Sequence, residues 1–317
     1  MFQAVRTDEL FRVLLFLLLI VGVYVAAGRI VYRRWRKDRT PLRRPHIAVL
    51  TAAGAGILCI LYGALVEPRW PEVTSTRVVT SRLPPGHRGI RIVHLSDLHS
   101  EATPTLETML PARVAALEPD LIVFTGDAAN STETLPVFRA WLSALAKIAA
   151  TFVVKGNWDS VSFIRGDRFG NTGATLLEGT SASIQVADVT VHVLGGGYDD
   201  TPALNAALAA LPPDGPAVVL FHHPYPDVIS PPFASRVDLM CTGHTHGGQV
   251  ALPFYGALLT LSKHGKRFER GFYPNADGFG FPLYINRGIG MGRPGPRVRF
   301  GARPEIAVIE LVPQVGG

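Results

Sequence analysis

The sequence predicts an α/β protein with two membrane-spanning helices in front of it, and three observations support this fold class. From residue 90 onward, short runs rich in β-branched residues alternate with helix-length segments. Polar residues directly follow five of these β-rich runs. Two long apolar runs lie earlier in the chain, before residue 67. Because the ligands of an open α/β sheet gather beyond the carboxyl ends of its strands, we expect these polar residues to form one site.

The two apolar runs, Leu10 to Gly28 and Ile47 to Val66, are each close to the roughly 20 residues that a bilayer-spanning helix needs. The loop between them, residues 29–46, carries eight Lys and Arg residues, and positive charge near membrane ends stays on the cytoplasmic side. Residues 1–66 are therefore predicted to form a multi-pass membrane hairpin, with the catalytic domain outside the cytoplasm. The alternative is a cleaved signal peptide ending near Val25-Ala26-Ala27, which would reverse this topology.

The charge of the chain is concentrated in this first segment. Ten of the 31 Lys and Arg residues but only three of the 25 Asp and Glu residues lie in the first 46, which leaves 21 basic and 22 acidic residues downstream. A near-neutral remainder gives no reason to expect nucleic-acid binding. Neither Cys59, inside an apolar run, nor Cys241, at a strand end, suggests a disulfide, so cysteine does not indicate the compartment.

Residues 67–89 are rich in proline and glycine and are predicted to be a linker, followed by a domain over residues 90–317. The apolar strands that precede polar groups are expected at residues 91–96, 121–124, 152–154, 217–221 and 237–241. Helices are expected at 104–117, 135–149 and 202–211, antiparallel strands at 183–187 and 190–194, long loops over 252–303, and a closing strand at 306–311.

Seven side chains at these strand ends are candidate metal ligands: Asp97, His99, Asp127, Asn157, His222, His244 and His246. Asp97 and His99 are spaced i, i+2, and so are His244 and His246. In extended backbone this spacing places both side chains of a pair on one side. Nitrogen and oxygen ligands without thiolate favour Mn, Fe, Zn or Ni over Ca. Two such metals about 3.5–4 Å apart share a bridging hydroxide and suit phosphate-ester hydrolysis, in which Asp127 could bridge both ions.

In order along the chain these groups read Asp97-Leu98-His99, Gly126-Asp127, Gly156-Asn157-Trp158-Asp159, His222 and Gly243-His244-Thr245-His246. The set resembles the calcineurin-like metallophosphoesterase family, in particular its membrane-associated bacterial branch. The resemblance covers residues 90–311 and implies a four-layer α/β/β/α sandwich. It further implies one metal held by Asp97, His99, Asp127 and His246, and a second held by Asp127, Asn157, His222 and His244.

One position departs from the family pattern, because the residue after Asn157 is commonly histidine and here is Trp158. An indole cannot deliver a proton at neutral pH. We therefore expect either a good leaving group, such as a pyrophosphate, or protonation by water or by His223, which is otherwise a turn residue. Asp159 either supports Asn157 or ends the turn, and Asn130 is expected to cap a helix. Arg270, Arg287 and Arg293 could bind phosphate but are also candidates for surface ion pairs.

The sequence thus predicts a membrane-anchored, two-metal phosphohydrolase that acts on a lipid or other cell-envelope substrate, with Asp127, Asn157, Asp159 and His223 as catalytic candidates. The expected partners are a lipid bilayer and a phosphorylated small molecule or lipid. Two alternatives stay open. One is a cytoplasm-facing pyrophosphatase of a nucleotide-linked lipid, and the other is a membrane sensor or scaffold that keeps the fold without turnover.

Overall fold

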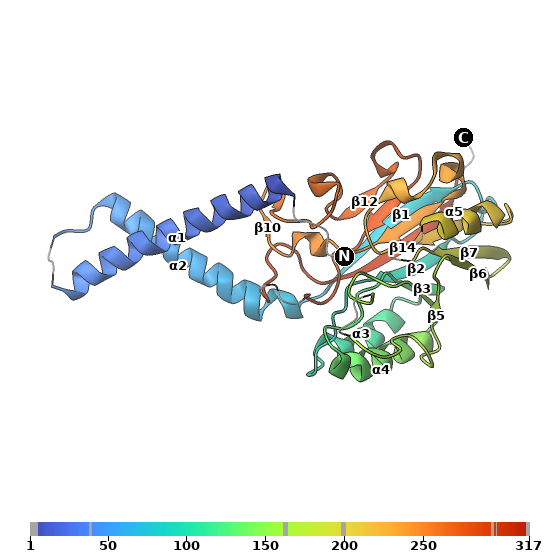
Figure 1. Cartoon of the computed structure of the whole chain (residues 1–317), viewed down its shortest axis with the longest axis horizontal. Coiled ribbons are helices and arrows are strands. Elements are labelled where there is room, and N and C mark those ends of the chain that lie inside the picture. Colours follow the sequence, from blue (N-terminus) through green and yellow to red (C-terminus); the bar gives the residue numbers. More distant parts are fainter. Residues whose placement is uncertain are drawn as a thin grey trace.

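The computed structural model describes residues 6–37, 40–160, 164–197, 201–292, 295 and 297–314. A two-helix hairpin projects from one end of an α/β domain like an arm (Figure 1). Its helices are α1 (Thr7–Trp35) and α2 (Arg44–Leu65). The predicted basic loop is thus shorter than expected, because Arg29, Arg33 and Arg34 lie on the last turns of α1. Asp38 and Arg39 of that loop lie outside the described residues.

The hairpin leaves most of its apolar side chains uncovered. The most apolar 18-residue windows of its two helices have mean hydropathies of 2.6 and 2.2, yet only 6% and 11% of these windows are buried. A core helix of a soluble protein would bury such a surface against its neighbours. Since α1 and α2 also have the length to cross a bilayer, they are candidate membrane helices.

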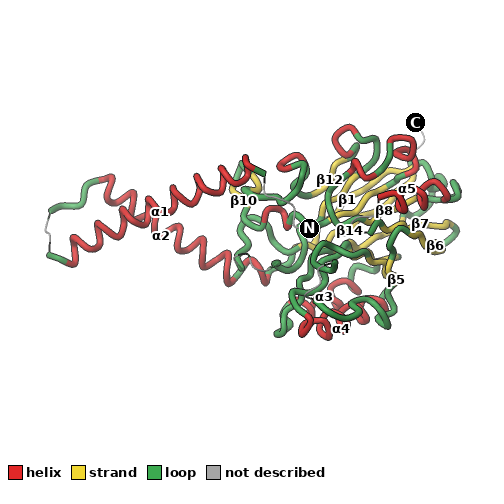
Figure 2. The backbone as a smooth tube through the Cα atoms, viewed as in Figure 1, coloured by secondary structure: helices red, strands yellow, loops and turns green. Residues whose placement is uncertain are grey.

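Two six-stranded sheets form the centre of the domain (Figure 2). The first has the order β1-β14-β2-β3-β4-β5 and the second β12-β13-β9-β8-β7-β6. Strands β2 to β5 are parallel neighbours, as are β7, β8, β9 and β13. The strands of the first sheet are β1 (Glu72–Thr80), β2 (Ile90–Leu95), β3 (Leu121–Phe124), β4 (Ala150–Val153), β5 (Thr175–Leu176) and β14 (Glu305–Pro313). Those of the second are β6 (Thr180–Val186), β7 (Val189–Gly195), β8 (Ala217–Leu220), β9 (Leu239–Thr242), β12 (Gly271–Tyr273) and β13 (Leu283–Ile285).

The apolar core is divided into three parts, which define four layers. Side chains such as Ile92 and Val123 from the first sheet pack against Val193 and Val218 from the second. The outer face of the first sheet is covered by α3 (Leu106–Ala115) and α4 (Leu135–Ala146), and that of the second by α5 (Thr201–Ala210) and the loops around it. The predicted α/β class with two sheets and outer helices is confirmed.

The linker prediction is wrong for residues 72–80, because they form β1 at the edge of the first sheet. This strand pairs in parallel with β14 over its whole length, from Glu72 opposite Glu305 to Thr80 opposite Pro313. Its sequence is rich in Val and Thr, which favour strands, but the surrounding prolines concealed this signal. The sheet therefore begins soon after α2, with the short turn Glu67–Arg69 and three further residues between them.

The remaining elements lie close to their predicted positions. Strands β6 and β7 are antiparallel, and the three domain helices end one to three residues before the predicted ends. The described residues of the segment 252–303 are mostly irregular. Its short strands include β11 (Gly256–Ala257), which pairs with β10 (Ala251–Leu252) near the base of the hairpin (Figure 1). These loops bring the C-terminal part of the domain next to the polar strand ends.

Candidate metal centre

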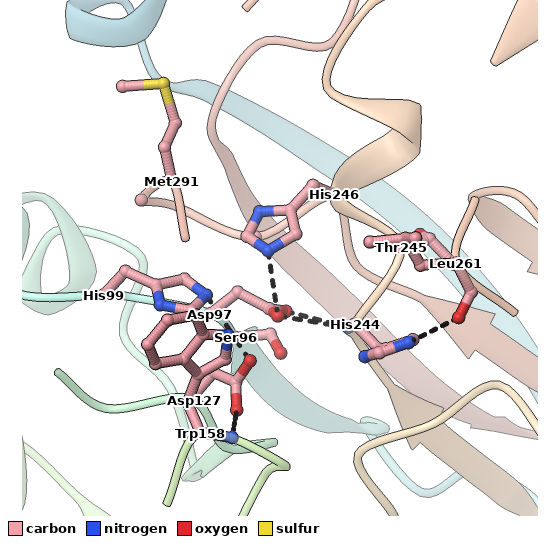
Figure 3. Close-up of polar contacts among 12 residues, drawn as sticks. Ser96, Asp97, His99, Asp127, Trp158, His244, Thr245, His246, Leu261 and Met291 are labelled. Carbon is pink, nitrogen blue, oxygen red and sulfur yellow. Dashed lines mark hydrogen bonds and ion pairs between the residues drawn. The ribbon is translucent and has the colours of Figure 1, made fainter. Parts of the chain in front are cut away.

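The seven predicted side chains converge at the carboxyl ends of β2, β3, β4, β8 and β9. The Nε2 atoms of His99 and His222 each lie 3.4 Å from Asp127 Oδ2. Asn157 Oδ1 lies 3.0 Å from both His222 Nε2 and His244 Nδ1. His246 Nε2 completes the cluster, 3.5 Å from Asp97 Oδ1 (Figure 3).

Within this cluster, two overlapping groups have ligand atoms close enough to hold a cation. Asp97, His99 and His246 form one group, and Asp97, Asp127 and His222 form the other, with all ligand atoms of a group within 4.8 Å of one another. Asn157 and His244 adjoin the second group through His222. Because the two groups share Asp97 and lie against the same Asp127 carboxylate, the arrangement has the form of a dinuclear site.

The backbone that presents these side chains is not extended, contrary to the argument from i, i+2 spacing. Asp97, His99, His244 and His246 have φ angles of 50°, 45°, 71° and 51°, and Asp127 has 60°. The left-handed region costs a non-glycine residue about 1 kcal/mol or more, and such conformations cluster at functional sites. As a consequence His244 and His246 diverge, so that one faces Asn157 and the other faces Asp97.

Asp159 ties together the two loops that carry Asp127 and Asn157. Its Oδ2 accepts hydrogen bonds from the backbone of Asp127 at 2.7 Å and of Gly156 at 2.8 Å, and its Oδ1 accepts one from Ala128 at 3.1 Å. A side chain on Gly156 would overlap the Asp127 carboxylate, so only glycine permits this approach. Burial and the neighbouring Asp127 raise the pKa of Asp159 to about 6. Asp159 therefore orders both loops rather than Asn157 alone.

Three of the four histidines have a hydrogen-bond acceptor on the ring nitrogen that points away from the centre. His222 Nδ1 donates to the carbonyl of Thr125 at 2.7 Å, and His244 Nε2 donates to the carbonyl of Leu261 at 2.8 Å. Since carbonyl oxygens only accept, each bond fixes a proton on the outer nitrogen and leaves the inner nitrogen as the one that can bind a metal once it is unprotonated.

His99 is oriented in the same way by Asn130, whose predicted role as a helix cap is wrong. The Asn130 amide nitrogen donates to the carbonyl of His99 at 3.0 Å and to Glu101 at 2.7 Å. Its oxygen is thereby turned towards His99 Nδ1, 3.1 Å away. Only the tertiary structure brings Asn130 and His99 together, although Asn130 follows the Gly126-Asp127 motif by a few residues.

His246 differs from the other three histidines, because its Nδ1 lies 3.4 Å from a guanidinium nitrogen of Arg299. Arg299 is fully buried, and burial lowers its pKa to about 10. The carbonyls of Arg287, Gly290 and Ala302 accept its hydrogen bonds at 2.6–3.1 Å. Sequence reasoning did not single out Arg299, and no motif marks it.

The electrostatics of the cluster fit divalent cations. Asp97 and Asp127 are 0% and 2% exposed, and His99 Nε2 is buried without a hydrogen-bond partner among the described residues. Burial lowers the pKa of His244 to about 4 and also lowers the pKa of His246, so both rings are neutral. Two buried carboxylates next to these neutral imidazoles and an amide oxygen favour a compensating positive charge, either a proton on His222 or a metal, and this donor set suits Mn, Fe, Zn or Ni.

Trp158 and His223 lie at the edge of the cluster. The backbone nitrogen of Trp158 donates to Asp127 Oδ1 at 2.8 Å, and its half-buried ring meets the His99 ring edge-on at 5.7 Å. His223 is buried with its ring centroid 4.1 Å from that of His244 and 4.8 Å from that of Tyr225. Burial and the neighbouring histidines lower the pKa of His223 well below its ordinary value.

The arginines considered as phosphate ligands have protein partners. Arg287 forms ion pairs with Glu72 at 2.8 Å and Glu305 at 3.3 Å, and Arg270 donates to the carbonyl of Gly301. These contacts favour structural roles over phosphate recognition. Arg293 lies outside the described residues.

Comparisons with known proteins agree with this geometry. A family model described as calcineurin-like phosphoesterase matches residues 90–248. The chain is 32% identical over 266 residues to the uncharacterized metallophosphoesterase YkuE of Bacillus subtilis, covering 79% of this chain and 88% of that protein.

Two further relatives match most of this chain. A Bos taurus transmembrane protein with metallophosphoesterase domain is 28% identical over 329 residues, covering 94% of this chain and 70% of that protein. The UDP-2,3-diacylglucosamine pyrophosphatase LpxG of Chlamydia trachomatis is 24% identical over 331 residues, covering 84% of this chain and 96% of that protein. Together with α1 and α2, these relatives suggest a membrane protein.

Proposed function

We propose a substrate and a location for this chain, which belongs to the calcineurin-like phosphoesterase family and is thus a phosphoester hydrolase. It cleaves a phosphate ester or pyrophosphate of a lipid or cell-envelope substrate while anchored in a membrane. Two metals would be held by the ligand sets that the motifs imply: Asp97, His99, Asp127 and His246 for one, and Asp127, Asn157, His222 and His244 for the other. When bound, such ions activate water as a nucleophile and polarise the phosphoryl oxygens.

The observation that carries this proposal is the unsatisfied charge of the cluster. Asp97 and Asp127 are buried next to His99 Nε2, for which the described part of the chain offers no hydrogen-bond partner. The protein's own groups would bind and orient: Asp159 holds the two loops, and Asn130, Thr125 and Leu261 fix the imidazole tautomers. A merely structural cluster would satisfy these polar atoms internally.

The substrate class follows from what stands next to the centre. Trp158 adjoins the His99 ring and has no proton to give at neutral pH, so a substrate whose leaving group needs no protonation is favoured, such as a pyrophosphate. LpxG, a relative over most of the chain, is named as a pyrophosphatase of a nucleotide-linked lipid. His223 is buried beside His244 and stays a candidate for orienting the leaving group.

The anchoring part of the proposal is supported by the exposed apolar faces of α1 and α2. The basic residues at the turn between the helices favour a cytoplasmic turn and an extracytoplasmic domain. A nucleotide-linked lipid substrate would require the opposite topology. A reporter fused after Gly317 that is active only outside the cytoplasm supports the first arrangement, and activity only inside supports the second.

The test of function uses full-length protein in detergent, freed of metal and reloaded with Mn²⁺. We expect hydrolysis of a bis-aryl phosphate and of a lipid pyrophosphate, abolished by a chelator and by Asp127→Ala. Uptake of metal without turnover of phospholipids, lipid pyrophosphates or nucleotides would instead support the sensor or scaffold. A protein that takes up no metal would refute the proposal.

A further inference from the structure

Both domain-facing ends of the hairpin make buried polar contacts with loops of the domain. At the start of α1, the side chain of Glu9 is fully buried although its neighbours on the helix are exposed. At the end of α2, Gly63 is buried and is followed by the buried Glu67. A helix pair that served only as a tether would have no need to bury a carboxylate at each end.

Glu9 holds the loop that orients His244. Its Oε1 accepts hydrogen bonds from the backbone nitrogen of Thr260 at 3.0 Å and from the Thr260 hydroxyl at 2.5 Å. The next residue, Leu261, offers the carbonyl that accepts from His244 Nε2 at 2.8 Å (Figure 3). One residue thus separates a helix of the hairpin from the group that fixes the tautomer of His244.

The conformation of Leu261 needs such support. Its φ angle is 53°, in the left-handed region that favours glycine, while its side chain is 42% exposed. A leucine in this region costs about 1–2 kcal/mol, and little packing of its own side chain offsets that cost. The hydrogen bonds from Thr260 to Glu9 hold the adjacent backbone and so keep the Leu261 carbonyl aimed at His244.

The end of α2 makes the equivalent contact on the side of His246. The carbonyl of Gly63 accepts from the backbone nitrogen of Arg299 at 2.9 Å. Glu67 accepts from the backbone nitrogens of Gly301 at 3.1 Å and Ala302 at 2.7 Å. The same short segment, residues 299–302, is therefore bound by two carbonyl or carboxylate groups of the hairpin end.

This segment carries the guanidinium that lies against His246. Arg299 Nη2 is 3.4 Å from His246 Nδ1, and Ala302, which Glu67 holds, supplies one of the carbonyls that orient Arg299. The approach at Gly63 is close, because a Cβ there would lie 2.8 Å from Val298 Cγ1 and 2.9 Å from the Arg299 carbonyl oxygen. Any shift of α2 at this point must move the backbone of Arg299.

We propose that the two ends of the hairpin are positioning elements of the metal centre: Glu9 positions His244 through Thr260 and Leu261, and the end of α2 positions His246 through Arg299. This inference rests on the proposed function in that it takes both histidines as metal ligands. Metal affinity then depends on residues in the helices, although none of these residues touches the metal.

The first test substitutes the glycine of α2 that has no room for a side chain. Gly63→Ala is expected to weaken one of two Mn²⁺ sites by about 10–100-fold, the usual effect of disturbing an outer partner of a ligand. The matched control is Gly54→Ala on the same helix, where nothing lies within 4 Å of the added Cβ. Calorimetric titration of Mn²⁺ into the metal-free, full-length protein in detergent measures both affinities.

The second test addresses α1. Glu9→Ala removes the acceptor for Thr260 and is expected to weaken the other Mn²⁺ site by a similar factor. Glu9→Gln keeps an acceptor oxygen and is expected to restore the affinity. Asp8→Asn is the control, because Asp8 is exposed and forms ion pairs with Arg6 and Arg12. The visible absorption of bound Co²⁺ reports on ligand geometry and should change in Glu9→Ala and Gly63→Ala but not in the controls.

The outcomes separate this inference from the function itself. If wild-type protein binds two ions and folded Glu9→Ala and Gly63→Ala variants bind them equally well, the inference is wrong and the function stands. Equal losses in Gly54→Ala and Gly63→Ala would also overturn it, because the effect would then be general to the hairpin. If wild-type protein binds no metal, both proposals fail. Should Glu9→Ala not fold, judged by thermal unfolding, Gly63→Ala decides.

Discussion

The hairpin is apolar and exposed, whereas the metal centre is polar and buried. Each region has groups in an unfavourable environment, and these groups indicate the kind of partner that it would bind. Across α1 and α2, large apolar side chains such as Leu18, 69% exposed, lie uncovered. In the centre, Asp97 and Asp127 are buried beside His244 and His246, which are neutral, so that in the metal-free protein a proton on His222 balances part of their charge. Water is a poor environment for the first region, and a protein interior is a poor one for the second.

The two regions would recognise their partners, a bilayer and a metal, in different ways. The apolar surface that a bilayer would contact extends over two whole helices, so no single side chain is decisive. The groups that could hold a metal are a few atoms within 4.8 Å of one another, so single atoms decide.

Leu18→Arg tests whether the exposed apolar face of α1 lies in lipid. A charge at the centre of a membrane helix costs about 3 kcal/mol, whereas a change at an exposed site in water costs almost nothing. We expect the variant to lose much of its membrane fraction on cell fractionation. Val79→Arg, at a domain valine that is 59% exposed, is expected to fractionate as wild type. Unchanged membrane association of Leu18→Arg would remove the argument for an anchor.

Asn130→Ala tests whether metal affinity at the centre depends on the side chain that orients His99. The substitution removes the acceptor 3.1 Å from His99 Nδ1 and frees the tautomer of that ring. Metal affinity is expected to fall about 10–100-fold in Mn²⁺ titrations. Gln185→Ala, on the exposed face of β6, serves as the control and should bind as wild type. An affinity of Asn130→Ala equal to that of the control would contradict the assigned role.

The pH dependence of metal binding follows from His222. Burial opposes its protonation, but the attraction of Asp127 outweighs burial and raises the pKa of His222 to about 9 in the metal-free protein. A metal ligand must be neutral, so below pH 9 the metal displaces one proton. Affinity should therefore rise by up to about tenfold per pH unit between pH 6 and 9.

This proton release is measured by titrating Mn²⁺ in two buffers that differ in ionisation enthalpy. The difference in heat gives the number of protons released, expected to be close to one at pH 7. A difference of zero would mean that His222 is neutral before metal binds, and would contradict the raised pKa.

Trp158→His has the smallest expected effect and tests whether a residue at the edge of the metal centre protonates the leaving group. A histidine next to the His99 ring could protonate a poor leaving group, which an indole cannot. We expect the rate with an alkyl phosphate to rise by less than about 100-fold, within the usual range for an acid catalyst, and the rate with an aryl phosphate to change little. Equal changes for both substrates would disprove the leaving-group argument.

The sequence alone determined the elements whose signal is local. The apolar lengths of α1 and α2, the buried strands β2, β3, β8 and β9, and the polar residues that follow these strands are all contained in neighbouring positions of the chain. Parallel strands bring their carboxyl ends to one edge, so the convergence of Asp97, Asp127 and His222 was predictable without coordinates.

Only the tertiary structure decided the rest, because the deciding contacts join residues far apart in the chain. Strand β1 depends on pairing with β14, and its own sequence is ambiguous. Asn130 and Arg299 acquire their roles from histidines 31 and 53 positions away. The left-handed turns at His244 and His246 are held by surrounding loops, including those that contact Glu9 and Gly63. Local sequence determines which groups are present, whereas long-range packing determines which atoms they face.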